Sequence, residues 1–400
     1  MGFLGRRFGQ AVAVVKGFAT SSVYTLDDQY FLTTKEGWAT TTGMDASGGS
    51  STATYSDPTG QQWKAHKFTA TGSLVVAAAA SPDIPDGNAI EYLCVGGGGG
   101  TGASCPSCYG TGGGGAGGLK SNVGGTMIAV TVNTYPVTVG GGGAGGPGPP
   151  DQDGSVGSDS IIGGPDITTI TSGGGGGGMK SQGWPPTGSY PTGTGGDPVA
   201  NGGSGAGGSS YPAIAPGQTS TGDSGHPGGV DVASPANGWG NDGAAPYSPD
   251  SWPAGDSAAG GGGAATAGTS SSRGDPPQAE GRSTAGPGGA GAAYTLVGGP
   301  TAPVYYSGGG GGGTSASQVA PQTPNQGIGG NSPTTKGGGG TGSGYAGPPG
   351  SGGDPTNNIG EAGEANTGGG AGGQNEGRSG VRDGLAGGSG IVVIRYKYPA

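Results

Sequence analysis

The sequence predicts a mostly irregular and β-containing fold, in which a bundle of about ten polyglycine-II helices is joined by long loops and closed onto a small antiparallel β module. Two observations predict the bundle and its partner. Glycine accounts for 107 of the 400 residues and gathers in runs, while segments of β-branched and aromatic residues precede the first run and follow the last. The glycine-rich runs are 96–100, 112–118, 140–146, 173–178, 202–208, 260–263, 308–313, 337–340, 368–373 and 384–390.

The overall composition leaves disorder as the alternative to this fold. Glycine and proline, 107 and 32 of 400 residues, together reach the level at which low complexity is the default interpretation. Charged residues make up only 10% of the chain, however, whereas solvated disordered chains are usually rich in charge. We therefore expect ordered structure.

Glycine runs can form a core if each run has neighbours. A polyproline-II-like helix has no internal hydrogen bonds, so its N–H and C=O groups point outward in three directions and can pair with adjacent helices. When helices pack this way on every side, their backbones come so close together that only glycine fits. We expect a core built from backbone, with occasional alanines on its rim. These alanines are Ala116, Ala144, Ala206 and Ala371.

The β module is predicted from short segments of alternating or continuous apolar residues between turn signals. Its expected strands lie within 63–68, 74–76, 89–95, 127–132, 135–139 and 391–396. Asn133-Thr134 is a plausible hairpin turn between two of them. The terminal strand is so apolar that we expect it to return and pair in the sheet formed by residues 63–139.

Four regions follow from these assignments. They are an N-terminal attachment or oligomerisation module at 1–60, the β module at 61–140, the bundle with variable loops at 141–385, and the closing strand at 386–400. The first region has too few apolar residues for a comfortable core of its own, so we expect it to pack against another chain.

Charge and hydropathy exclude several classes of partner. The formal net charge is -10, and the sequence has no basic patch of the kind that neutralises nucleic-acid phosphates. We therefore expect no binding to nucleic acid. No apolar stretch approaches about 18 residues, and we expect no membrane insertion.

Motifs that carry chemistry are sparse. Cys105 and Cys108 form one CxxCxGxG unit, but a structural zinc site needs four ligands, so we expect no metal; a Cys105–Cys108 disulfide and two unpaired thiols both remain open. Glycine runs satisfy dinucleotide-binding patterns trivially, and no cofactor is expected. The two histidines, His66 and His226, lack a nucleophile context, so no enzymatic activity is predicted.

The loops between glycine runs hold the best candidates for binding. Rigid aromatic side chains stand there among Ser, Asn, Asp and Gly, which is the composition of paratopes and of glycan-binding loops. The alternative is that the same aromatics seal the ends of the bundle. The candidate residues are Trp184, Tyr190, Tyr211, Trp239, Tyr247 and Trp252.

An ordered set of motifs resembles the glycine-rich domain of phage structural proteins, which is frequent in tail fibres and appendages of marine phages. The motifs are HKFTATGSLVV at 66–76, IEYLCV at 90–95 running into glycines, GGGGAGG at 112–118, YPVTV at 135–139, ITTI at 167–170, and GGSGIVVIRY at 387–396. The resemblance implies a virion component assembled in the host cytoplasm, with a homo-oligomeric state. It further implies that residues 1–60 contact other virion proteins and that the loops contact a host-surface glycan or outer-membrane protein.

Two functions follow as expectations. The first is a tail fibre or adhesin that displays loops on the glycine bundle for binding to a host receptor. The alternative is a purely structural virion appendage, such as a capsid fibre or a filament-forming protein. An ice-binding role is a third, weaker hypothesis, since flat bundles can present rows of Thr and Ser.

Overall fold

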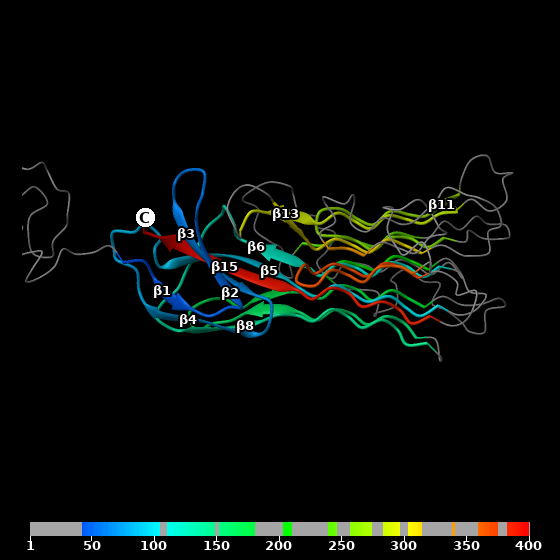
Figure 1. Cartoon of the computed structure of the whole chain (residues 1–400), viewed down its shortest axis with the longest axis horizontal. Coiled ribbons are helices and arrows are strands. Elements are labelled where there is room, and N and C mark those ends of the chain that lie inside the picture. Colours follow the sequence, from blue (N-terminus) through cyan, green and yellow to red (C-terminus); the bar gives the residue numbers. More distant parts are fainter. Residues whose placement is uncertain are drawn as a thin grey trace, which may run out of the picture.

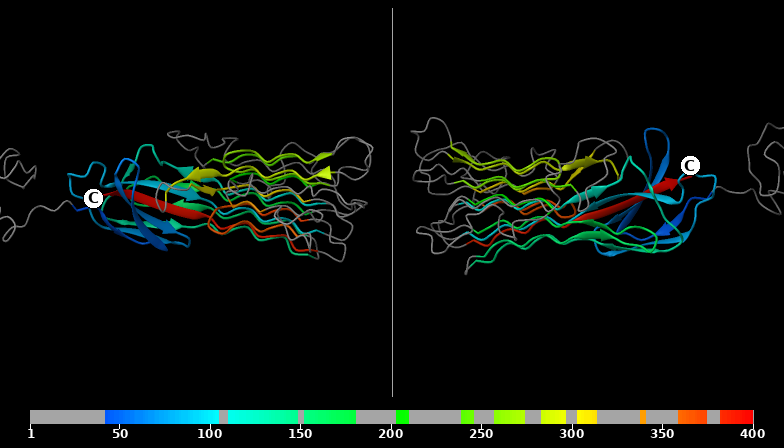
Figure 2. Two further views of the ribbon diagram at one scale, coloured as in Figure 1. Left: turned by 45° about the horizontal axis from the view of Figure 1, so that its top comes forward. Right: turned by 180° about the vertical axis from the view of Figure 1, so that it is seen from behind.

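The structure is a computed structural model that describes residues 42–104, 110–148, 152–180, 203–209, 239–245, 257–273, 283–296, 303–313, 338–340, 359–374 and 382–399. Within these residues the chain is β-rich, its sheets are antiparallel, and it contains no helix. A β module occupies one end of the molecule. Glycine-rich segments run side by side from that module to the other end (Figures 1 and 2).

The β module is made of two sheets. The six-stranded sheet has the order β2-β3-β15-β5-β6, with the short β7 also paired to β5. Its strands are β2 (Ser51–Ser56), β3 (Gln62–Phe68), β5 (Ala89–Val95), β6 (Leu119–Ser121), β7 (Ile128–Ala129) and β15 (Ile391–Tyr398). The five-stranded sheet has the order β1-β4-β8-β9-β10. Its strands are β1 (Asp45–Ser47), β4 (Gly72–Ala78), β8 (Thr134–Thr138), β9 (Ser160–Ile162) and β10 (Ile170–Ser172).

The C-terminal strand β15 lies in the middle of the six-stranded sheet. Val392 faces Phe68 of β3 on one side and Cys94 of β5 on the other. This confirms that the end of the chain returns to pair with strands encoded some 300 residues earlier. A central position explains why the segment is apolar almost throughout, since a strand with covered faces does not alternate.

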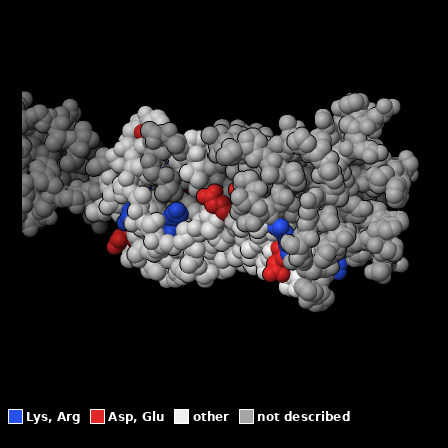
Figure 3. Space-filling model, turned by 45° about the vertical axis from the view of Figure 1, so that its right-hand side comes forward, with Lys and Arg blue, Asp and Glu red and all other residues white. Residues whose placement is uncertain are grey.

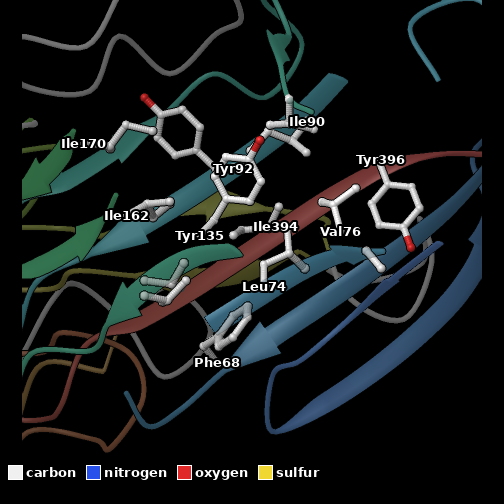
Figure 4. Packing of buried hydrophobic residues seen from close by; sticks show 14 of the residues in the cluster. Phe68, Leu74, Val76, Ile90, Tyr92, Tyr135, Ile162, Ile170, Ile394 and Tyr396 are labelled. Atoms are coloured by element: carbon white, nitrogen blue, oxygen red, sulfur yellow. The ribbon is translucent and has the colours of Figure 1, made fainter. Parts of the chain in front are cut away.

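The main hydrophobic core fills the space between the two sheets. Figure 4 shows Tyr135 from one sheet approaching Tyr92 and Ile394 from the other. Tyr135, Leu74 and Ile394 are fully buried. Burying large aromatic and aliphatic side chains of this kind contributes about 2 kcal/mol each.

A second core covers the outer face of the six-stranded sheet. It joins Leu93 and Val393 of that sheet to residues from late in the chain, among them Trp239 and Tyr306. Every residue of β5 is therefore buried. Two short hairpin pairs also come from this late region: β13 (Ala292–Tyr294) with β14 (Val304–Tyr306), and β11 (Ser272–Arg273) with β12 (Ser283–Thr284).

Two expectations about the module are wrong. The predicted hairpin around Asn133-Thr134 does not form, because β7 pairs with β5 whereas β8 pairs with β4 and β9. The boundary at residue 60 is also misplaced, since β1 and β2 belong to the two sheets of the module. The part of the predicted 1–60 region before residue 42 lies outside the described residues.

Extended glycine-rich segments form the rest of the described molecule, and we call them together the glycine bundle. Its runs are 96–104, 110–118, 140–148, 152–158, 173–180, 203–209, 239–245, 257–263, 266–271, 285–290, 307–313, 338–340, 359–364, 368–374 and 382–390. The first two lie within the predicted β module, so module and bundle interleave along the chain rather than following one another at residue 140.

Hydrogen bonding within the bundle follows a three-residue period. Along run 96–104, successive amides donate to three neighbouring runs in a fixed order that then repeats. The donor amides and acceptor oxygens are Gly96 to Gly118 at 3.0 Å, Gly97 to Ser158 at 2.9 Å, Gly98 to Gly388 at 2.9 Å, Gly99 to Gly115 at 2.8 Å, Gly100 to Ser155 at 3.0 Å and Thr101 to Leu385 at 2.8 Å.

The carbonyl groups of the same run accept from three further runs. Gly97 O accepts from Gly175, Gly98 O from Gly143, and Gly99 O from Ala371. Run 96–104 is thus enclosed by neighbours on all sides, and its backbone polar groups are satisfied by other backbones.

This packing explains why the interior of the bundle is mostly glycine. A Cβ atom placed on Gly99 would overlap the carbonyl oxygen of Gly176, and one on Gly113 would overlap that of Gly310. The expected position of the alanines is largely wrong. Ala116, Ala206 and Ala371 are fully buried, and Ala144 is exposed.

Candidate functional site

The end of the bundle opposite the β module is defined by where the runs stop. Run 96–104 starts directly after β5, so Ser104 lies at the opposite end, where it pairs with Arg382. The amide of Thr111 donates to Gln374 O at 2.9 Å at the same end. We call this the distal end.

Several segments outside the described residues connect two run ends that both lie at the distal end. Gly313 lies at the distal end, because its amide donates to Thr111 O at 3.0 Å, and Ala258 N donates to Gly313 O at 2.9 Å, so run 257–263 begins at the distal end. Connecting segments of this kind are 105–109, 149–151, 246–256, 274–282, 341–358 and 375–381. The bundle therefore holds their attachment points together, at the greatest distance from the β module (Figure 1).

Three longer connecting segments join a distal run end to a run start at the module end. Segment 181–202 is one of them. It follows Lys180 at the distal end, where the Lys180 amide donates to Asp153 Oδ1. It precedes Gly203 near the module, where the Gly203 amide donates to Gly174 O. Segments 210–238 and 314–337 are the other two. Runs on either side of such a segment consequently point the same way.

Five of the six predicted binding aromatics lie in these connecting segments and hence outside the described residues. Tyr247 and Trp252 belong to the distal segment 246–256. Trp184, Tyr190 and Tyr211 belong to the longer segments. Tyr211 follows Ser209, the distal end of its run, by only two residues.

The sixth aromatic, Trp239, is a core residue. Its side chain is 5% exposed and packs in the second core, and its amide and carbonyl exchange hydrogen bonds with Leu119. The expectation that Trp239 is an exposed binding aromatic is therefore wrong. It covers the edge strand β6 at the module end of the bundle, which agrees with the alternative that such aromatics seal the bundle.

Two tyrosines belong to the same core as Trp239: Tyr306 is buried and Tyr294 is partly buried. Burial raises the pKa of both Tyr294 and Tyr306 to about 12. Ser307, next along the chain, has a positive φ of 63° and donates its hydroxyl to the carbonyl of Gly117. This corner thus anchors late runs to an early one.

The three cysteines lie in two different parts of the chain. Cys94 is buried in β5, its thiol lies 3.4 Å from Ser160 O, and burial raises its pKa to about 12. Such a thiol is inert at neutral pH because the thiolate is the reactive form. Cys105 and Cys108 lie in a distal connecting segment outside the described residues.

Charged groups are few over the described surface. Figure 3 shows isolated acidic and basic side chains on one face of the molecule. The described residues hold no group of three or more His, Cys, Asp or Glu side chains that could bind a metal ion. Nowhere in the described ranges is there an apolar helix of membrane-spanning length.

Sequence reasoning missed several strands, among them the exposed edge strand β2. Its sequence STATYS carries the alternation of Thr52, Thr54 and Ser56 with Ala53 and Tyr55, which is a period-two signal. The signal is present in the sequence, but it lies before residue 60, inside the region predicted to be the N-terminal module.

The fold and the distal end together define a scaffold: a β sandwich from which a bundle of glycine-rich backbone extends. The chain belongs to the glycine-rich domain family, whose model matches residues 69–277, more than half of the 400-residue chain. No curated protein matches the sequence.

Proposed function

We propose that this protein is a display protein of a bacteriophage particle, a tail fibre or adhesin whose glycine bundle presents variable loops to a receptor on the host surface. The observation that carries the proposal is the gathering of run ends at the distal end, opposite the β module. A scaffold of this kind fixes many loops at one end and leaves their sequences free to vary.

The proposal includes a polyglycine-II conformation for the runs. The support is that successive amides from Gly96 to Thr101 donate to three neighbouring runs in turn, and this order repeats every three residues. A left-handed helix with three residues per turn directs successive N–H groups in three directions and forms no internal hydrogen bonds. The crowding at Gly99 and Gly113 is what such helices require when packed on all sides.

The binding surface in this proposal consists of the aromatics that the runs hold outside the two cores. Tyr247 and Trp252 are the leading residues, because segment 246–256 joins two distal run ends. Trp184, Tyr190 and Tyr211 are the others. Aromatic rings among small polar residues suit a glycan or an outer-membrane protein of the host, since they offer flat apolar area with little loss of entropy.

The β module lies at the end of the molecule opposite the distal loops. The described chain begins at Thr42, which bonds to Ser81 of the module, so residues 1–41 join the chain at the end remote from the distal loops. Their role in this proposal is to contact other virion proteins. Attachment and receptor binding would then use opposite ends of each chain, in a homo-oligomer assembled in the host cytoplasm.

Binding of the full chain to bacterial surface material tests the proposal. The probes are an array of bacterial surface polysaccharides and outer-membrane vesicles from a panel of bacteria. We expect at least one probe to be bound, and we expect binding to fall at least tenfold when residues 246–256 are replaced by a Gly-Ser segment of equal length. Replacement of 149–151 by Gly-Ser-Gly is the matched control, because it also joins distal run ends but carries no aromatic residue.

Two results would overturn the receptor-binding role. One is that no probe is bound by the full chain. The other is that a variant with Trp184, Tyr190, Tyr211, Tyr247 and Trp252 all changed to Ala binds as the unchanged protein does. A thermal unfolding midpoint within a few degrees of the wild-type value would establish that each variant is folded.

A purely structural appendage is the second candidate, and the burial of Trp239 favours it. If the other loop aromatics also seal the bundle, the distal end has no receptor surface. Electron microscopy of particles carrying a tagged copy distinguishes the two, since an adhesin belongs at a tail or fibre tip and a structural appendage belongs along the particle or its filaments.

A further inference from the structure

The outer edge of strand β2 has the features of an interaction surface. β2 is the last strand of the six-stranded sheet and pairs only with β3 among the described strands (Figure 1). The hydrogen bond from Asp57 N to Gln61 O, 2.9 Å long, fixes which residues of the ladder bond to β3. Because bonded and non-bonded residues alternate in an antiparallel pair, Ala53 and Tyr55 bond inward.

The residues between them consequently direct their backbone groups outward. These are Thr52, Thr54 and Ser56, all of which are exposed. Their amides and carbonyls have no backbone partner within the described residues. Three evenly spaced residues with free donors and acceptors form a template for one more strand.

Natural sheets usually protect such an edge, and the edges formed by β1 and β6 are protected. β1 is three residues long, carries Asp45 and contains a register irregularity between Asp45 and Ala46. β6 is covered by the bridge between Leu119 and Trp239. β2, in contrast, has six residues without charge, proline or glycine.

The edge is also self-complementary. A two-fold axis through Thr54 places that residue opposite its own counterpart and Thr52 opposite the counterpart of Ser56. All outward-facing groups then meet in hydrogen-bonded pairs, and the facing side chains are hydroxyl-bearing residues that pair favourably across strands. A parallel arrangement does not achieve this, because a bonding residue in a parallel ladder faces a non-bonding one.

We propose that β2 is the docking edge for a second copy of this chain, joined by antiparallel β2–β2 pairing across a two-fold axis at Thr54. The two six-stranded sheets become continuous in the dimer. Since β2 runs from the bundle toward the remote end of the module, the antiparallel pairing directs the two glycine bundles in opposite directions. The dimer is therefore an elongated rod with a distal end at each tip.

Site-specific crosslinking tests the register directly. In a background in which Cys105 and Cys108 are changed to Ser, Thr54→Cys should form an intermolecular disulfide under mild oxidation. The two Cα atoms of a hydrogen-bonded antiparallel pair lie about 5.5 Å apart, within the range of a disulfide. Thr52→Cys is the matched control, because its counterpart lies four residues along the strand, about 14 Å away, and should not crosslink.

The oligomeric state provides a second measurement. By light scattering after size exclusion, the full chain should have twice its 37.2 kDa mass. Thr54→Lys should weaken the dimer at least tenfold, because the axis brings the two lysines together. Thr269→Lys, an exposed residue of the bundle, should leave the dimer unchanged.

Three outcomes overturn the proposal. They are a wild-type chain that stays monomeric at 100 µM, crosslinking of Thr52→Cys as efficient as that of Thr54→Cys, and a dimer that survives Thr54→Lys but dissociates when residues 1–41 are removed. The last outcome would assign the interface to the N-terminal segment. None of these results bears on receptor binding by the distal loops.

Discussion

The guanidinium of Arg395 holds the carboxylate of Glu91 across two neighbouring central strands, with Nε 2.6 Å from Oε2. The Arg395 side chain also donates to the Tyr55 hydroxyl at 2.9 Å and lies 4.2 Å from the centre of the Trp63 ring. Glu91 in turn accepts from the amide of Gly124. This one interaction connects β5, which leads into the first glycine run, to β15, which follows the last.

Breaking this pair should destabilise the fold substantially. The two side chains are only 12% and 6% exposed, so Arg395→Met leaves a nearly buried carboxylate without its partner. We expect a loss of about 3 kcal/mol in the free energy of unfolding, measured by urea denaturation.

The control for this prediction is the exposed pair formed by Lys397 and Asp86, whose carboxylate side chain is 60% exposed. Lys397→Met should change the free energy of unfolding by less than about 1 kcal/mol. Equal losses in the two variants would show that the Arg395 pair does not hold the terminal strand in place.

The glycine bundle should be sensitive to single methyl groups at its centre. A Cβ on Gly99 would overlap the backbone of Gly176, so Gly99→Ala should cost about 2 kcal/mol or more. Gly141 has no atom within 4 Å of the corresponding position, and Gly141→Ala should be neutral or slightly stabilising. Thermal unfolding of both variants provides the measurement, and similar midpoints for the two would contradict a core made of packed backbone.

Stability should fall on acidification through His66. Its Nδ1 donates to Gly48 O at 2.8 Å, and its Nε2 faces the Tyr396 hydroxyl at 3.4 Å. Burial lowers the pKa of His66 below its usual 6.5, and nearby Lys64 acts in the same direction. Because the unfolded chain binds the proton more readily, the stability due to neutral His66 is complete above pH 6.5 and is lost as the pH falls toward its folded pKa.

Unfolding by urea between pH 7.5 and pH 5 tests this behaviour. The range avoids the carboxylates, whose ordinary pKa values lie near 4. The variant His66→Gln retains a side-chain donor but does not titrate, and its stability should be nearly flat over the same range. A wild-type protein with equally flat stability would show that His66 does not govern the response.

Cys94 should resist alkylation for as long as the protein is folded. Its thiol is buried and its pKa is about 12, so iodoacetamide at pH 8 should modify it at least 100-fold more slowly than a free thiol. Mass spectrometry of digested samples, with and without urea, measures the ratio. Rapid labelling in the native state would indicate that β5 opens, which its position between two cores argues against.

Local patterns in the sequence were sufficient to predict the strands of the sandwich that carry clear apolar patterns, but not the short or polar ones. The alternation of Ile90, Tyr92 and Cys94 predicted a strand at 89–95, and the apolar segment 391–396 predicted another. Both are strands, and both lie inside the six-stranded sheet. Residues 66–68 and 74–76 were likewise assigned to strands that exist. The polar strand β2 was missed because its alternation is carried by Thr and Ser, which give little hydrophobic contrast.

The sequence could not predict how strands and runs associate. Asn133-Thr134 has the composition of a hairpin turn, yet β8 pairs with β4 because the five-stranded sheet buries Tyr135 and Val137 against the main core. Trp239 has the context of a binding loop, but the outer face of the six-stranded sheet needs a cover and Trp239 provides part of it. Pairings of this kind depend on contacts between residues far apart in the chain.

The sequence by itself determined that glycine is the organising residue, that strands bracket the runs, and that the chain's end closes the sheet, since each follows from a local pattern and from the absence of side chains to bury. Only the tertiary structure decided which runs are neighbours, that Ala116, Ala206 and Ala371 are interior, and that Trp239 belongs to a core. The physical reason is that glycine runs are nearly identical in sequence. Their partners are selected by the strands and turns at which each run begins and ends.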